Sequence, residues 1–275
     1  MPQVTVILPT WNRAKWLKQS VESVLSQTFQ DFELIVVDDA STDSTGKILE
    51  SYSGKIRTIL LPENLGVSAA RNTAIVQSDS KWIAFLDSDD YWHAEKLEKQ
   101  IKQTRLCPEY QIHFTDEIWI RNGIRVNPKN KHRKREGWIF KPSLALCLMA
   151  PSTVMLRREL LERHGMFDEA LPVCEDYDLW LRLTAYHPVA LLNEKLMTRQ
   201  GGHLDQLSRK YWGIDRFRVQ SLQKILNREN LRSGDRIAAI RMLRKKSEIL
   251  IKGFRNRGKI KEICVYQKIV QKYSD

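Results

Sequence analysis

Three carboxylates lie close together at the end of an apolar segment, in the sequence WIAFLDSDDYW (residues 82–92). They are Asp87, Asp89 and Asp90, and aromatic side chains flank them on both sides. Like charges at this spacing repel one another, so the cluster is unfavourable unless a cation or a polar ligand offsets it. Mg²⁺ and Mn²⁺ prefer oxygen ligands, and Mg²⁺ typically takes only one or two protein carboxylates while the substrate supplies other ligands. The pattern therefore predicts an open cation site.

A second group of acids lies much further along the chain, in EDYDLWLRLTAY (residues 175–186). Leu179 and Leu183 fall at helical spacing, which predicts a helix whose first turn carries the acids. The helix dipole favours ionised carboxylates at that end, and an ionised carboxylate can act as a general base. Asp176 can therefore serve as a base on one side of a reacting centre while Asp89 holds a cation on the other.

Four apolar segments alternate with helical patterns and would position these groups. Residues 4–9, 33–39, 56–62 and 82–87 predict strands, because each is a short, largely apolar or β-branched run. Runs that are apolar throughout are typical of a parallel sheet covered by helices on both faces. Ligands bind beyond the carboxyl ends of such strands. The polar residues at these ends, which we expect to converge on one edge of the sheet, are Thr10, Trp11, Asn12, Asp38, Asp39, Asp87 and Asp89.

Neither GxGxxG nor GxxxxGK[ST] follows any of these strands. The phosphates of a bound nucleotide would then be neutralised by a metal ion on carboxylates. The four cysteines, Cys107, Cys147, Cys174 and Cys264, form no CxxC pair. We expect plain buried thiols in a reducing cytosol, without a zinc site or a disulfide framework.

The 275 residues carry a formal net charge of +12, and 42% of them are hydrophobic. This is enough apolar material for one large domain, or for a domain with a smaller appendage. No apolar stretch follows a basic start, so we expect no signal peptide, and the longest uncharged run, residues 142–156, is too short to span a membrane. Residues 241–275 contain eleven Lys or Arg against three acids, an excess of +8. This basic segment predicts an anionic partner: a lipid surface, a nucleic acid or another protein.

The second half of the chain has weaker patterns. Residues 121–137 contain an Asn-Gly turn and a basic stretch, which indicates either a mobile loop near the site or a solvated excursion. Beyond Gly213 the sequence has helical patterns throughout, and Ser233 is placed to cap one of these helices. We therefore expect a domain of residues 1–213 followed by a basic helical extension of residues 214–275.

Four motifs occur in a characteristic order: VTVILPTWNRAKWLKQSVESVLSQTFQDFELIVVDDASTDST, NLGVSAARN, FLDSDD and EDYDLWLRL. Together they resemble the family-2 glycosyltransferases of the GT-A fold, over roughly residues 1–210. A single DxD is common by chance, but four motifs in this order and spacing are specific. The resemblance implies an α/β fold of Rossmann-like type, with a mostly parallel sheet and helices on both faces, to which the C-terminal helical extension is added.

The resemblance also implies an inverting transfer of a sugar from a nucleoside diphosphate donor, with Mn²⁺ or Mg²⁺ as the metal. Asp39 would accept a hydrogen bond from the donor base, and Arg71 would face the base or the phosphates. Asp87 would hold the ribose, Asp89 would ligate the metal, and Asp176 would be the catalytic base. The remaining residues implied for the site are Pro9, Thr10, Trp11 and Ser88 as donor contacts, and His203 near the diphosphate or the metal.

Several of these residues also have structural interpretations. Asp43 is expected to be a helix cap, and Asp90 is either a metal neighbour or, as we favour, the N-cap of a helix beginning near Ala94. Glu175 is either a functional acid or only a first-turn acid, and His203 is either a ligand or a hydrogen-bonded loop histidine. The other residues with an expected structural role are Asp178, as a solvent-facing or structural acid, and Trp92 and Trp180, as core residues.

These inferences predict a hexosyltransferase that uses a nucleoside-diphosphate sugar, with UDP-sugars favoured, and a glycan or lipid-linked acceptor. Surface polysaccharide or glycolipid assembly at the cytosolic face of a membrane would suit the basic segment. A non-catalytic sugar-nucleotide-binding module is an alternative, although it would have no use for both Asp89 and Asp176. A basic nucleic-acid-binding protein is a less favoured alternative, because the positive charge lies in the C-terminal segment, while the strand ends are acidic and would repel phosphate unless a metal intervenes.

Overall fold

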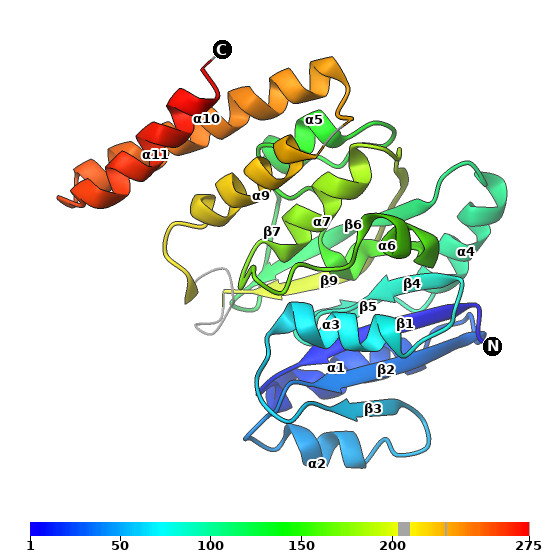
Figure 1. Cartoon of the computed structure of the whole chain (residues 1–275). Helices are drawn as coiled ribbons and strands as arrows, with labels where there is room; N and C mark the ends of the chain where they lie inside the picture. The colour runs from blue at the N-terminus through cyan, green and yellow to red at the C-terminus, as the bar shows by residue number, and fades with distance from the viewer. Residues whose placement is uncertain (203–209, 229, 275) are drawn as a thin grey trace.

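The computed structural model describes residues 1–202, 210–228 and 230–274. Within this part of the chain, nine strands form one sheet that carries helices on its faces (Figure 1). The strands are β1 (Val4–Thr10), β2 (Phe32–Asp38), β3 (Arg57–Leu60), β4 (Trp82–Phe85), β5 (Tyr91–Trp92), β6 (Ile112–Arg121), β7 (Ile124–Val126), β8 (Val154–Arg157) and β9 (Ala190–Gly201). The helices between them are α1 (Ala14–Leu25), α2 (Thr45–Glu50), α3 (Val67–Val76), α4 (Lys96–Leu106), α5 (Phe140–Ser143), α6 (Arg158–His164) and α7 (Glu175–Thr184).

The strand order is β3-β2-β1-β4-β8-β6-β9-β5, with β7 paired to β6. Strands β1, β2, β3 and β4 are parallel. Strand β8 is antiparallel to both β4 and β6, and β9 is parallel to β6. Strands β1, β2, β4, β6 and β9 therefore all point toward the same edge of the sheet. On that edge, β1 and β2 lie on one side of β4, whereas β6 and β9 lie on the other.

Apolar side chains cover both faces of the sheet, as the unbroken apolar runs predict. On one face, Ile7 and Phe85 pack with α3, α6 and α7. On the other face, Val6 and Leu8 pack with α1, α2 and α4. Successive residues of a strand point to opposite faces, so a run without polar residues can be buried on both sides. The α/β class with helices on both faces is confirmed.

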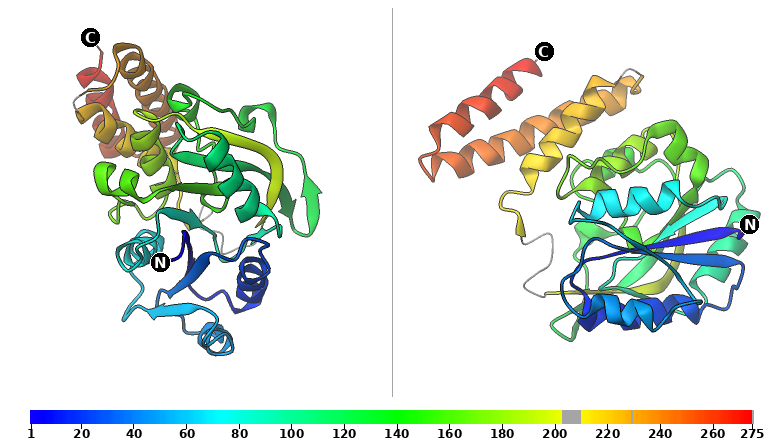
Figure 2. Two further views of the ribbon diagram at one scale, coloured as in Figure 1. Left: turned by 90° about the vertical axis from the view of Figure 1, so that its right-hand side faces the viewer. Right: turned by 60° about the horizontal axis from the view of Figure 1, so that its bottom comes forward.

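Three helices follow the sheet: α9 (Asp215–Asn227), α10 (Ser233–Arg255) and α11 (Ile260–Lys272). Helices α10 and α11 run side by side, away from the sheet (Figure 2). Apolar residues of α9 and α10 pack on the outer side of α7, so these helices share a core with it. Ser233 was expected to cap a helix, but it is the first residue of α10 and makes no capping bond. Among the helices of the described residues, none combines the length and the apolar character that crossing a membrane requires.

The segment of residues 121–137 begins as a β-hairpin. Asn122 and Gly123 form a two-residue connection between β6 and β7, and their φ angles are 49° and 78°. Positive φ at both central residues is the geometry of a type I′ turn, which Asn-Gly favours. The turn is thus confirmed, whereas the expectation of a loop throughout this segment is wrong for its first residues.

Candidate active site

A cavity of about 960 Å³ lies at the carboxyl edge of the sheet. Residues that follow β1, β2 and β4 line it, together with the start of α7 and the outer parts of β6 and β9. His203, an expected ligand, lies outside the described residues. The other residues expected at the site all line this cavity: Pro9, Thr10, Trp11, Asp39, Arg71, Asp87, Ser88, Asp89 and Asp176.

The part of the cavity beside β1 and β2 has a mixed apolar and polar lining. The Trp11 side chain is 41% exposed. Thr10 is buried, and its Oγ1 has no hydrogen-bond partner among the described residues. A buried hydroxyl without a partner is unfavourable by about 1–3 kcal/mol, so a ligand that bonds to it would gain from the contact. These features suit a flat, polar group such as a nucleoside base.

The Asp39 carboxylate organises the loop that closes this part of the cavity. It lies directly after β2 and is 3% exposed. Three donors reach it, namely Asn64 Nδ2 at 2.9 Å, Leu65 N at 2.7 Å and Gly66 N at 2.8 Å. Both carboxylate oxygens are thus engaged, and a ligand could use only the remaining lone pair. Asp39 therefore holds residues 64–66 against the cavity in addition to lining it.

Asp90 is a structural residue at the junction of three strands. Its Oδ2 accepts a hydrogen bond from Ser152 Oγ at 2.7 Å, and its Oδ1 accepts one from Gln200 N at 3.0 Å. The expectation that Asp90 caps a helix is wrong, because α4 begins at Lys96 and Glu95 occupies the N-cap position. The short strand β5 separates Asp90 from the helix and directs its side chain into the sheet edge instead.

The acidic cluster after β4 keeps unfavourable electrostatics in the absence of a cation. Burial raises the pKa of Asp90 well above its usual range, and the charges of Asp89 and Asp87 raise it further, although Arg199 acts in the opposite direction. Asp89 is half-buried and lines the cavity. Its carboxylate fits a Mg²⁺ or Mn²⁺ ion, whose remaining ligands would come from a diphosphate and water. Within the described residues, no three His, Cys, Asp or Glu side chains form a closed metal cage.

Arg71 connects α3, the end of β4 and the start of α7 through buried ion pairs. Its Nη2 lies 2.7 Å from Asp87 Oδ1, and its Nη1 lies 2.8 Å from Glu175 Oε1. The side chain is 2% exposed, and its guanidinium lies over the Phe167 ring at 4.9 Å. Because both terminal nitrogens bind protein carboxylates, Arg71 orients Asp87 within the cavity wall.

Glu175 is buried, so it is not a solvated first-turn acid. Burial raises its pKa from the ordinary value of 4.5 to about 7, and the charge of Asp176 raises it too, while Arg71 opposes both effects. The preceding residue, Cys174, adopts φ = 66°, in the left-handed region that non-glycine residues rarely occupy. The chain changes direction at Cys174 and enters α7 at the next residue, where the Glu175 side chain pairs with Arg71.

Asp176 is the second residue of α7 and lies half-buried in the cavity wall. Its Oδ1 accepts a hydrogen bond from Tyr177 N at 2.7 Å, and its Oδ2 accepts one from Cys147 Sγ at 3.3 Å. Burial, together with the Asp176 charge, raises the pKa of the Cys147 thiol well above its usual range. The single thiol proton has two acceptors within reach, Asp176 Oδ2 and the Met149 carbonyl oxygen at 3.2 Å, and when it is donated to Asp176 it orients a carboxylate that lines the cavity.

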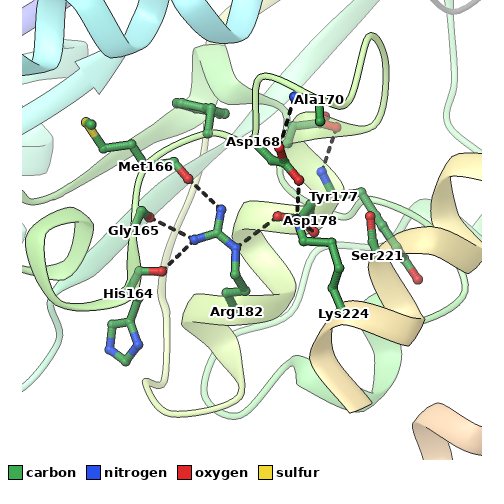
Figure 3. Close-up of polar contacts among 12 residues, drawn as sticks. His164, Gly165, Met166, Asp168, Ala170, Tyr177, Asp178, Arg182, Ser221 and Lys224 are labelled. Atoms are coloured by element: carbon green, nitrogen blue, oxygen red, sulfur yellow. Dashed lines mark hydrogen bonds and ion pairs between the residues drawn. The ribbon is translucent and has the colours of Figure 1, made fainter. Parts of the chain in front are cut away.

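A charge network also fixes α7, from Asp178 in its first turn to Arg182 in its last (Figure 3). Asp178 is 1% exposed, so the solvent-facing alternative is wrong and the structural one holds. Arg182 Nε lies 2.9 Å from Asp178 Oδ2, and Lys224 Nζ lies 2.8 Å from Asp178 Oδ1. Lys224 also pairs with Asp168, and the Arg182 guanidinium donates to three backbone carbonyls of residues 164–166. The network ties α9 and the 164–170 segment to the helix that carries Asp176.

Several further charged residues line the cavity and were not expected from the sequence, among them Glu117 on β6, Lys134, and Arg199 on β9. Glu117 and Lys134 form an ion pair at 2.7 Å with 4% and 9% of their side chains exposed. The charges of Glu117, Asp90, Asp87 and Asp176 raise the pKa of Arg199, so this cation lies among carboxylates from both halves of the site. The signal in the sequence is the alternation of Glu117, Trp119 and Arg121 along one strand.

Residues 5–165 match the model of the family described as Glycosyl transferase family 2, and the chain belongs to this family. An uncharacterized glycosyltransferase of Rickettsia felis is 32% identical over 202 residues, which span 70% of this chain but only 32% of that protein. The Escherichia coli protein named UDP-Glc:alpha-D-GlcNAc-diphosphoundecaprenol beta-1,3-glucosyltransferase WfgD is 34% identical over 191 residues, which span 69% of this chain and 73% of that protein. The chain thus carries a family-2 glycosyltransferase domain, and it spans only about a third to three fifths of the length of several of these relatives.

The fold agrees with that of a solved structure. S. aureus TarS in complex with UDP-GlcNAc superposes with a TM-score of 0.71 at 23% identity, over 92% of this chain and 72% of that chain. The chain thus has the GT-A fold that the four motifs imply.

Proposed function

We propose that the protein transfers a sugar from a UDP-sugar to a hydroxyl group of a glycan or lipid-linked acceptor, with inversion at the anomeric carbon. The observation that carries the proposal is the single cavity that joins the β1 and β2 ends, the acidic cluster after β4, and Asp176 at the start of α7. The similarity to WfgD, whose name describes a glucosyltransferase that acts on a lipid-linked sugar, supports a role in surface polysaccharide or glycolipid assembly.

In this proposal the nucleoside lies against Thr10 and Trp11, within the loop that Asp39 holds. Asp87, oriented by Arg71, accepts a hydrogen bond from the ribose. The diphosphate then extends over the end of β4 toward Asp89. This orientation leaves the sugar between the acidic cluster and α7.

Asp89 would hold a Mn²⁺ or Mg²⁺ ion, and such an ion would offset the negative charge that develops on the diphosphate leaving group. Asp176 removes the proton from the acceptor hydroxyl as that oxygen attacks the anomeric carbon and the bond to the diphosphate breaks. A carboxylate is a competent base only when ionised, and the start of α7 favours the ionised form. Cys147 and the Tyr177 N–H orient the carboxylate for this transfer.

The proposed location is the cytosolic face of a membrane, reached through α10 and α11. These helices carry most of the +8 excess of residues 241–275. They also expose Ile249, Ile260 and Val265, at 54%, 72% and 55%. Basic residues near an anionic lipid surface gain about 1 kcal/mol each at low salt. Replacing Lys245, Lys252 and Lys268 with Gln should weaken binding to phosphatidylglycerol vesicles, whereas the same change at the exposed Lys55, Lys81 and Lys102 should not.

The proposed function is tested with two variants and one control. Asp89→Ala should abolish Mn²⁺-dependent binding of UDP, measured by calorimetry, and leave the protein folded. Asp176→Asn should keep UDP affinity while transfer falls by about 10² or more, the usual scale for loss of a general base. Asp79→Ala, which removes an exposed acid elsewhere, should change neither. Unchanged metal-dependent binding in Asp89→Ala, or normal turnover in Asp176→Asn, would contradict the proposed roles.

A further inference from the structure

The cavity extends well beyond the space that a nucleotide would occupy. In the sheet order, β1 and β2 lie on one side of β4, and β6 and β9 lie on the other. The proposed contacts of the base are on the β1 and β2 side, and the proposed ribose contact, Asp87, follows β4 itself. The wall on the far side is built by Glu117, Trp119 and Arg121 of β6, by His132 and Lys134, and by Arg199 of β9. None of these residues has a part in the proposed donor site.

The backbone of β6 directs these side chains into the cavity. Residues 117, 119 and 121 are two apart, so their side chains project from the same face of the strand. Trp119 is the register partner of Arg199 on β9, which brings Arg199 to the same face. The ladder between β6 and β9 is irregular at Asp116, directly before Glu117. Such bulges bend a strand and re-aim the side chains that follow them.

Glu117 carries an acceptor oxygen that this wall leaves unsatisfied. Its Oε1 binds Lys134, but its Oε2 is buried and has no hydrogen-bond partner among the described residues. Burial raises the pKa of Glu117, and the charges of Lys134 and Arg199 lower it. The nearby Trp119 indole N–H lowers the pKa of Glu117 further. That indole nitrogen likewise lacks a partner of proper hydrogen-bond geometry in the described chain. A ligand hydroxyl could accept from one of these groups and donate to the other.

The rim of the same wall is strongly basic. Residues 121–137 contain seven Lys or Arg against one acid. Arg121 is exposed and lies over the Trp119 ring at 5.8 Å, and His132 meets that ring edge-on at 5.0 Å. An aromatic surface with a few convergent polar groups is the usual composition of a small-molecule site. The exposed cations favour a ligand that carries negative charge.

We propose that this wall is the acceptor subsite and that the acceptor is an anionic sugar. One hydroxyl of its ring bonds to Glu117 Oε2, the ring lies against Trp119, and its anionic group lies near Arg121. The inference rests on the proposed function, because it takes the donor to occupy the other half of the cavity. Both a phosphate on the sugar and the carboxylate of a uronic acid have the required charge.

The test uses four probes that differ in charge: the propyl glycoside of GlcNAc, propyl-linked GlcNAc phosphate and diphosphate, and propyl glucuronide. Binding of each probe to the full chain is measured by calorimetry, and UDP affinity is measured in a separate titration. The wild-type protein should bind at least one anionic probe about tenfold more tightly than the neutral glycoside. The more tightly bound anion, phosphate or carboxylate, identifies the source of the charge. Equal affinities for all four, or no binding of any, would overturn the proposal.

Two variants distinguish the subsite from general charge effects. Arg121→Ala should reduce the preference for the anionic probe by about tenfold and leave UDP affinity unchanged. Arg105→Ala, which removes an exposed cation on α4, should leave both unchanged. Glu117→Gln should weaken the binding of all four sugar probes, including the neutral glycoside. If Arg121→Ala keeps the preference for the anionic over the neutral probe, the subsite proposal is refuted. If the protein binds the anionic probe but not UDP, only the proposed donor function is refuted.

Discussion

Replacement of Glu175 by Gln should change how stability depends on pH. The folded-state pKa of Glu175, about 7, lies above its ordinary value of 4.5. The folded protein therefore binds more protons than the unfolded chain between these two values, and the free energy of unfolding falls as pH rises through that window. Below pH 4.5 the group is protonated in both states and the loss has not begun. Above pH 7 the loss is complete.

The magnitude follows from the same two values. Each tenfold change in proton affinity is worth about 1.4 kcal/mol, so the shift of Glu175 amounts to about 3 kcal/mol. Gln keeps the shape and does not titrate. The unfolding free energy of Glu175→Gln minus that of the wild type should therefore rise by about 3 kcal/mol between pH 4.5 and pH 8, whatever its value at pH 4.5.

Urea unfolding at four pH values, in metal-free buffer, measures this difference. Glu159→Gln removes an exposed acid from the first turn of α6 and serves as the control, for which a flat difference is expected. A flat difference for Glu175→Gln as well would show that Arg71 fully compensates the buried charge. The inference that burial raises the pKa of Glu175 in the folded protein would then be wrong.

Three other predictions concern buried groups. Lys224→Met should lower the urea midpoint by an amount that corresponds to about 1–3 kcal/mol, because it removes one of the two cations that bind the buried Asp178. Lys96→Met should raise the melting temperature at pH 7, because Lys96 is fully buried and burial lowers its pKa well below the ordinary value of 10.5. The gain in melting temperature should shrink as pH approaches 10.5, where the lysine of the unfolded chain also loses its proton. Cys147→Ala should lower turnover without changing UDP affinity, because the thiol orients Asp176.

Each of these predictions has a control or a contrary outcome. Lys245→Met changes an exposed lysine of α10 and should leave the urea midpoint unchanged. A gain for Lys96→Met that does not shrink with pH would mean that the ammonium charge is not its cause. Cys264→Ala alters an exposed thiol and should be silent, and equal loss of turnover in both cysteine variants would contradict the orienting role of Cys147.

Local patterns predicted the first four strands and many of the residues that line the cavity. Apolar runs identified β1 to β4, and the order of four motifs identified the residues that line the cavity. These signals are readable because strand ends bring their polar residues together by a general rule of parallel sheets. The alternation along β6 places Glu117 on one face with Trp119 and Arg121, but it does not show that this face meets Arg199. The pairing of β6 with β9 joins segments 80 residues apart, and pairing of that kind leaves no local pattern.

The roles of single acids depended on tertiary contacts. Asp90 and Glu175 both precede or begin helical patterns, so capping and first-turn roles were the natural expectations. The structure buries both and gives them partners that are distant in sequence: Ser152 and Gln200 for one, and Arg71 for the other. Helix-capping preferences describe a helix end that is exposed to water. A buried carboxylate instead needs a hydrogen-bond donor or a cation, and the fold decides which residue supplies it.

The packing of α9 and α10 on α7 bears on how the protein is made. During synthesis the chain emerges from its N-terminus at about 5–20 residues per second. Helix α7 is therefore translated before the helices that cover it, and its outer side, with Tyr177 and Leu181, waits several seconds for its cover. During that interval the outer side of α7 presents an apolar surface to solvent, and transiently exposed apolar surface of this kind favours aggregation and chaperone binding. Final packing of α7, the helix that carries Asp176, is thus a late event in the synthesis of this protein, set by the translation of α9 and α10.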